Sequence, residues 1–183
     1  MRPASITRRL AVAAIVAAIA PGAFLPASSS QRSSWRQATD AELAALLPAR
    51  APVEKEHIET EKRTATGITD GHGRFIASIL LVTAGYSADG KYSHYLMVQA
   101  PMRIAGVSLT PGEYVLGWER DPKDDDALNV HIYESLSGKL LGTAQGHIIP
   151  KNSRVETMRI WPPAIKPTIQ IGRFGISYEL GRR

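Results

Sequence analysis

The side chains best suited to acid–base chemistry are the five histidines. Because the chain contains no cysteine, a zinc site would also need histidines and carboxylates. No two of them have the i, i+4 spacing of a helical zinc motif or the i, i+2 spacing of one strand face. His131 and His147 lie on either side of a Ser-Gly turn and can approach each other across a hairpin. With His94 and a carboxylate, they are the candidates for a hydrolase or lyase site. The spacing favours exposed strand histidines over ligands, so we predict no metal and no cofactor.

Acidic residues gather at positions 121–126, with the sequence DPKDDD. A calcium loop of the EF-hand type needs oxygen ligands at alternate positions and a glutamate at the twelfth, but the twelfth residue counted from Asp121 is Ile132. The segment is therefore typical of a solvated hairpin tip. The chain also lacks the G-x-S-x-G pattern of a nucleophilic serine and a glycine-rich phosphate loop.

Aromatic residues provide the clearest case for binding. After the Pro-Gly turn at 111–112, Tyr114 and Trp118 alternate with polar residues and point to one face of a strand. Tyr92 and His94 follow an Asp-Gly hairpin signal on another predicted strand. Such side chains either fill a core or line a pocket for a small apolar ligand. We take Tyr92, His94, Tyr114 and Trp118 as the candidate ligand-binding residues.

Turn signals at regular intervals from residue 55 onward separate segments of strand length. The run 75–83 is apolar on both faces and predicts a central strand, whereas 128–133 alternates and predicts a strand with one buried face. The sequence therefore predicts a mainly β fold, a single antiparallel β-barrel or β-sandwich of about eight or nine strands with one short N-terminal helix. Further strands are expected at 92–99, 112–119, 140–148, 155–161 and 174–180.

The predicted helix covers residues 39–47. Thr39 and Glu42 have the spacing of a capping box, in which each side chain accepts a hydrogen bond from the other residue's backbone N–H, and Pro48 ends the helix. Leu43, Leu46 and Leu47 form an apolar stripe on it. A two-turn helix is marginally stable alone, so the stripe docks either on the β domain or on another molecule.

The N-terminus has the order of a secretory signal peptide. Arginines at 2, 8 and 9 precede the apolar run 10–20, and small residues follow at 27–30. The run is shorter than the about 20 residues of a spanning helix, so we expect no stable membrane span after processing. The predicted organisation is a signal peptide at 1–29, a flexible leader and short helix at 30–54, and a β domain at 55–183. The predicted location is periplasmic or secreted.

Charge argues against nucleic acid as a partner. The chain has a net charge of +5, but three of its 22 basic residues lie in the predicted signal peptide, which leaves 19 against 17 acidic ones. The remaining charges are interleaved, as in EKE at 54–56, whereas nucleic-acid binding requires a basic stripe on one face.

The segment 101–120, PMRIAGVSLTPGEYVLGWER, resembles a module of uncharacterised secreted bacterial β-rich proteins. There a short strand and a glycine turn lead through L-x-P-G-x-Y into the next strand. The later segments KLLGTAQGHII and IQIGRFGISYEL are similar to its closing strands, so the resemblance covers about residues 90–180. It implies a compact exported β domain and assigns no catalytic residue.

Together these patterns predict an exported, non-catalytic envelope or periplasmic β domain that binds a small apolar ligand or a partner protein. One alternative is a structural or interaction module that docks through Leu43, Leu46 and Leu47. A second is a hydrolase or lyase with the histidine and carboxylate site described above. Three structural observations distinguish these functions. A large apolar cavity would support ligand binding, an exposed leucine stripe would support the interaction module, and a convergence of histidines with an acid would support the enzyme.

Overall fold

The computed structural model describes residues 35–83, 91–150 and 153–181. The predicted signal peptide and its cleavage site lie outside the described residues and stay predictions. The one helix of the described part is seven residues long and falls well short of a membrane span. The described elements are β1 (Arg36–Gln37), α1 (Asp40–Leu46), β2 (Arg50–Val53), β3 (Glu56–Thr69), β4 (Phe75–Leu81), β5 (His94–Val98), β6 (Met102–Ile104), β7 (Val107–Leu109), β8 (Gly112–Asp121), β9 (Asp124–Glu134), β10 (Leu140–Ile148), β11 (Glu156–Ile160), β12 (Thr168–Gly172) and β13 (Phe174–Leu180).

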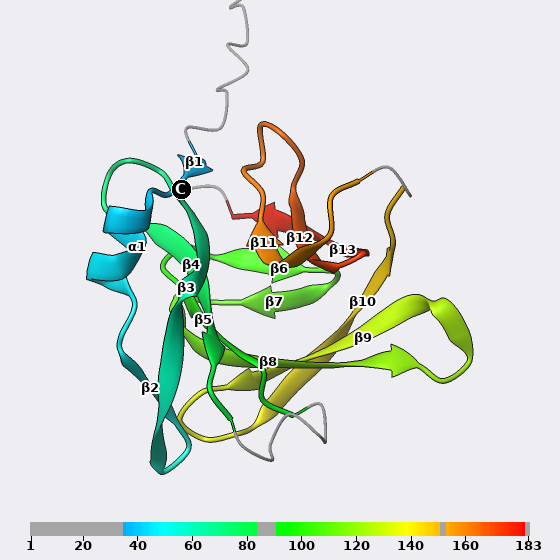
Figure 1. Ribbon diagram of the computed structural model, residues 1–183, viewed down its shortest axis with the longest axis horizontal. Coiled ribbons are helices and arrows are strands. Elements are labelled where there is room, and N and C mark those ends of the chain that lie inside the picture. Colours follow the sequence, from blue (N-terminus) through cyan, green and yellow to red (C-terminus); the bar gives the residue numbers. More distant parts are fainter. Residues whose placement is uncertain (1–34, 84–90, 151–152, 182–183) are drawn as a thin grey trace, which may run out of the picture. The chain divides into compact units, whose positions relative to one another are not determined.

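The strands form one antiparallel sheet that is curled into a half-barrel (Figure 1). Its order is β1-β3-β4-β5-β8-β9-β10-β13-β12-β11, while β2 pairs with the first part of β3 and the β6–β7 hairpin pairs with the end of β13. At the open side of the half-barrel, β11 approaches β3, but these two strands form no backbone pairing. The Ile160 N–H of β11 donates to Thr66 Oγ1 of β3 over 3.2 Å.

The prediction of a mainly β, antiparallel fold is confirmed. The number of strands and the shape of the sheet differ from the prediction. The described residues contain thirteen strands rather than eight or nine, in a half-barrel rather than a closed barrel or a sandwich. Six strands lie outside the strand segments named from the sequence. Five of them have two to five residues each, which is too short for an alternating pattern to stand out: β1, β2, β6, β7 and β12. The sixth is β3, which has 14 residues but no regular alternation of buried and exposed positions.

The sheet is buried on both faces where β4, β5 and β8 run side by side. Ile76, Leu96 and Leu116 point into the half-barrel and belong to the first core cluster. Their neighbours along the same strands, such as Ala77 and Val115, point to the outer face and belong to a second cluster under α1 and β2. A strand with both faces covered reads as a continuous apolar run. This explains the apolar run at 75–83, which was predicted to be a central strand and contains β4.

Helix α1 begins at the predicted capping box. Thr39 Oγ1 accepts from the Glu42 N–H over 3.3 Å, and Glu42 Oε2 accepts from the Thr39 N–H over 2.8 Å. Leu43 and Leu47 are buried in the second cluster, and Leu46 packs against it. The leucine stripe therefore docks on the protein's own sheet.

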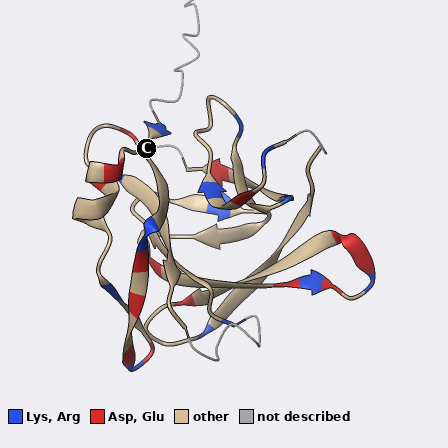
Figure 2. Ribbon diagram, viewed as in Figure 1, with Lys and Arg blue, Asp and Glu red and all other residues tan. Residues whose placement is uncertain are grey.

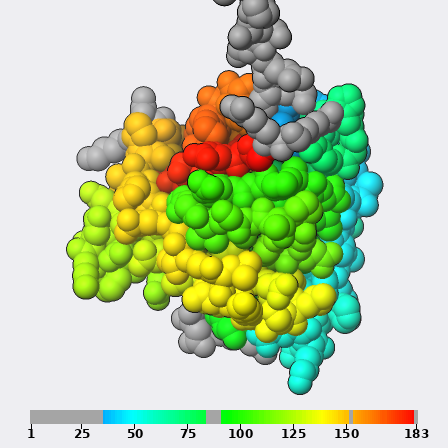
Figure 3. Space-filling view, turned by 180° about the vertical axis from the view of Figure 1, so that it is seen from behind, coloured from blue at the N-terminus to red at the C-terminus, as the bar shows by residue number. Residues whose placement is uncertain are grey.

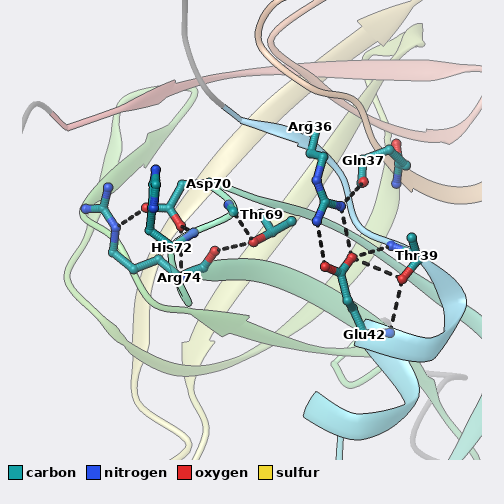
Figure 4. A network of polar contacts seen from close by, with 9 residues as sticks. Arg36, Gln37, Thr39, Glu42, Thr69, Asp70, His72 and Arg74 are labelled. Carbon is teal, nitrogen blue, oxygen red and sulfur yellow. Dashed lines mark hydrogen bonds and ion pairs between the residues drawn. The ribbon is translucent and has the colours of Figure 1, made fainter.

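Polar contacts join β1 to the start of α1 and shape the neighbouring β3–β4 turn (Figure 4). Arg36 of β1 forms two hydrogen bonds with the Glu42 carboxylate, at 2.6 and 2.9 Å. Beside it, the buried Asp70 accepts from the His72 and Arg74 N–H groups and from Arg74 Nε, which shapes the β3–β4 turn. Strands β1 and β2 thus belong to the sheet, and the predicted domain boundary at residue 55 falls in the turn between β2 and β3.

Candidate functional site

The structure places the four predicted ligand-binding residues on two sides of the sheet. His94 and Trp118 are neighbours on the inner face, with ring centroids 4.9 Å apart. Tyr114 is buried in the first cluster, where its hydroxyl donates to the Thr110 carbonyl over 2.7 Å. Tyr92 is buried in the second cluster. The four side chains therefore do not line a common pocket.

His94 is a buried, neutral imidazole. Its Nδ1 lies 3.0 Å from Ser93 Oγ, and its Nε2 has no hydrogen-bond partner among the described residues. Burial lowers the pKa of His94 to about 4, because the charged form loses its hydration inside the protein. A general base must reach its substrate's proton, and this nitrogen faces the core.

The other two candidate histidines lie apart from His94. His131 is on the outer face of β9, where Nδ1 is 2.9 Å from Thr143 Oγ1 and Nε2 is 3.5 Å from Glu119. His147 is four residues beyond Thr143 along β10, a separation of about 13 Å at the rise of a strand. In the described parts of the chain, no three His, Cys, Asp or Glu side chains are grouped to hold a metal ion.

The interior of the half-barrel is filled by side chains. The cavity inside it has a volume of about 10 Å³, and seven aliphatic residues line it, Ile104 and Leu116 among them. A larger hollow of about 320 Å³ opens at the surface where β2 and β3 meet the end of β4. Arg50, His57 and Glu59 line that hollow, so its walls are mostly polar. Neither space matches the pocket for an apolar ligand that the sequence predicts.

The clearest unoccupied apolar surface is the turn between β9 and β10, residues 134–141, which we call the leucine turn. Leu136, Leu140 and Leu141 are 65%, 50% and 40% exposed. Successive strand residues normally point to opposite faces, but the register shifts between Leu140 and Gly142. This bulge leaves two consecutive leucines at the surface. In Figure 3 the turn (yellow) forms part of the lower end of the domain.

Backbone hydrogen bonds hold the leucine turn in one conformation. The Glu134 N–H donates to the Lys139 carbonyl and the Gly138 N–H to the Glu134 carbonyl, each over 2.9 Å. Ser135 joins the turn to two other elements, because its N–H donates to the Glu113 carbonyl and its hydroxyl to the Pro52 carbonyl. The apolar surface is therefore preorganised.

Glu54, at the tip of the β2–β3 hairpin, braces the leucine turn from the side. Its N–H donates to the Ser135 carbonyl over 2.7 Å, and a Cβ on Gly138 would collide with its carboxylate. The Tyr92 hydroxyl donates to the same carboxylate, with Lys91 Nζ 3.4 Å away. These donors hold the pKa of Glu54 below its usual value, and the pKa of Tyr92 is raised, first by burial and then by the carboxylate.

Sequence reasoning recognised the Ser137-Gly138 turn but not the leucines around it. Leu140 and Leu141 were included in a predicted strand, where one of each consecutive pair is expected to be buried. The available signal was Leu136, a large apolar residue inside a polar turn. The contact with Glu54 had no sequence signal, because it joins residues far apart in the chain.

The chain was compared with protein-family models, with curated proteins and with solved structures, and none of the three comparisons finds a match. The resemblance to secreted bacterial β-rich proteins therefore stays a prediction. A function for this chain has to be argued from its own surface.

Proposed function

We propose that the chain is an exported, non-catalytic β domain that binds a partner protein through the leucine turn. The observation that carries the proposal is the exposure of Leu136, Leu140 and Leu141 on a braced turn. Exposed apolar groups on a rigid turn lose little conformational entropy on binding, so their burial contributes directly to affinity. Glu134 and Lys139 lie on either side of Leu136 in the sequence of the turn, and a partner that combines apolar side chains with charges of both signs fits this surface.

A partner protein fits these observations better than a small ligand. The filled interior offers room for about one water molecule, whereas ligand cavities measure about 300–1,000 Å³. The alternative of docking through α1 loses support because Leu43 and Leu47 are buried against the sheet. The alternative of a histidine and carboxylate enzyme loses support because His94 and His131 lie on opposite faces of the sheet.

Site-specific photo-cross-linking in the cells that make the protein tests the proposal. A photoreactive amino acid is placed at Leu140 or, as the matched control, at Ile148 on the same strand, which is 46% exposed. We expect a discrete protein adduct from position 140 that is absent from position 148 and is lost when Leu136 and Leu141 are changed to serine. Identical adducts from both positions, or none from position 140, contradict the proposal.

Two further measurements separate the proposal from its alternatives. Saturable binding of an apolar fluorescent naphthylamine that the leucine substitutions do not affect would instead favour an internal ligand. Export is tested by N-terminal sequencing of the mature protein, for which we expect a start between Ser28 and Gln31. A mature chain that still begins at Met1 contradicts export.

A further inference from the structure

Another exposed apolar residue, apart from the leucine turn, lies in the loop 161–167. This loop, WPPAIKP, joins β11 to β12, and we call it the tryptophan loop. Its Ile165 is 67% exposed, the highest value among the large apolar side chains that the structure describes. In Figure 1 this loop (orange) projects at the upper end of the domain, away from the leucine turn. A tip residue of this kind contributes nothing to the core.

The tryptophan loop has a fixed shape. The Trp161 N–H donates to the Thr168 carbonyl over 3.0 Å and closes its base. The N–H groups of Ile165 and Lys166 both donate to the Pro162 carbonyl, over 2.9 and 3.0 Å. The loop also contains three prolines, which restrict its backbone further. Ile165 is therefore presented by a rigid turn.

Cationic groups surround the indole at the base of the loop. The Arg159 guanidinium and Lys166 Nζ each lie 4.3 Å from the Trp161 ring. The buried Gln170 accepts from Trp161 Nε1 over 3.1 Å and from Lys166 Nζ over 3.4 Å, which fixes both groups. Arg159 Nη1 lies 3.8 Å from the Glu156 carboxylate, while its Nε has no hydrogen-bond partner among the described residues. Fixed cations thus stand beside an exposed aliphatic tip.

Charge is unevenly distributed over the domain. Residues 153–173 contain four basic residues and one acidic residue, a net charge of +3, whereas residues 54–61 contain four acidic residues and one lysine, a net charge of −3. Figure 2 shows the acidic residues on the β2–β3 ribbon, far from the tryptophan loop, and basic ones around β11 and β12. An anionic surface therefore attracts the end that carries Ile165 and repels the other.

We propose that the tryptophan loop seats the domain on an anionic lipid bilayer. Ile165 enters the boundary between headgroups and acyl chains, Trp161 lies at headgroup level, and Arg159 and Lys166 contact lipid phosphates. This surface goes beyond the proposed partner binding and rests on different residues. It leaves the leucine turn facing away from the membrane.

A lipid surface explains the loop better than a soluble anion does. A soluble phosphate or an acidic protein segment can pair with the cations, but it gives no role to an aliphatic side chain raised on a proline-rich tip. Interfacial membrane contacts combine apolar, indole and cationic groups in one place. The experiments below compare anionic vesicles with dissolved phosphate and so separate a lipid surface from a soluble anion.

Because the chain contains no cysteine, a single cysteine introduced into the full chain can be labelled at one chosen position. Ile165→Cys, and Leu136→Cys as a control of nearly equal exposure, are each labelled with an environment-sensitive fluorophore. With vesicles of phosphatidylglycerol and phosphatidylcholine, we expect a blue shift and quenching by brominated lipid for the label at 165, and neither for the label at 136. An equal response at both positions, or no response at 165, overturns the proposal.

The charge requirement is tested with the same label. Pure phosphatidylcholine vesicles should give little binding, and Lys166→Gln should weaken binding to the anionic vesicles by about fivefold, the effect of one cation at such a surface. Lys123→Gln, at the exposed tip of the β8–β9 hairpin, should leave binding unchanged. Equal binding to neutral vesicles, or full competition by dissolved inorganic phosphate at the same ionic strength, overturns the proposal. Thermal melting of each variant verifies that it is folded.

Discussion

His94 should make the stability of the domain strongly dependent on pH. Its imidazole is buried and its pKa is lowered to about 4, whereas an imidazole in the unfolded chain has a pKa of about 6.5. Between these values the unfolded chain binds a proton that the folded chain does not. The stabilisation from the neutral imidazole is therefore fully present above pH 6.5 and is lost as the pH falls toward 4.

The size of the effect follows from the two pKa values. One unit of difference corresponds to 1.36 kcal/mol, so the full effect is about 3 kcal/mol, of which about 2 kcal/mol is lost between pH 7 and pH 4.5. His94→Leu removes the ionisable group while keeping an apolar side chain against Trp118. At pH 7 this substitution should change the free energy of unfolding by no more than about 1 kcal/mol, because it removes one hydrogen bond, between Nδ1 and Ser93 Oγ, and Nε2 has no partner among the described residues.

Urea unfolding at pH 7 and pH 4.5 measures the difference. We expect the wild-type chain to lose about 2 kcal/mol more than His94→Leu between the two pH values. His72→Gln, on the exposed β3–β4 turn, is measured in parallel as a second histidine substitution. If His94→Leu and the wild type lose stability equally, the folded imidazole accepts a proton at pH 4.5 and the reasoning from burial is wrong.

Three further substitutions, two at glycines and one at the helix cap, are measured by the same unfolding experiment at pH 7. Gly67→Ala should cost about 2–3 kcal/mol, because its Cβ would lie 2.7 Å from the Ile76 carbonyl oxygen on the neighbouring strand. Gly73→Ala has a positive φ but nothing within 4 Å of the added Cβ, so its cost should be about 1 kcal/mol; equal losses would contradict the close approach. Thr39→Ala should cost about 1 kcal/mol through loss of the helix cap, and a loss below 0.3 kcal/mol would contradict it.

Patterns that are local in the chain predicted local structure well. The capping box of Thr39 and Glu42 and the alternation after Pro111-Gly112 each depend on residues within one element, and α1 and β8 form where they predict. The apolar run at 75–83 predicted a covered strand for the same reason. It could not show what covers the strand, because the second face is covered by α1 and β2.

The candidate surface was less predictable because it depends on contacts between distant residues. The exposure of Leu140 and Leu141 follows from a shift in register, and the shape of their turn follows from Ser135, Pro52 and Glu54. The four aromatic and histidine candidates were chosen for their types. Their types are equally suited to core packing, and Tyr92 and Tyr114 pack in different layers.

The position of the last strand has a consequence for how the chain folds as it is made. β13 is an inner strand of the sheet, between β10 and β12, and its Phe174, Ile176 and Tyr178 belong to the first core cluster. A nascent chain that still lacks these residues has neither a continuous sheet nor a complete core. Because loop closure over such long separations comes before any gain from packing, the complete core forms only after residues 174–180 have been made. A chain that stops before residue 174 should therefore leave β10 and β12 without the strand that joins them.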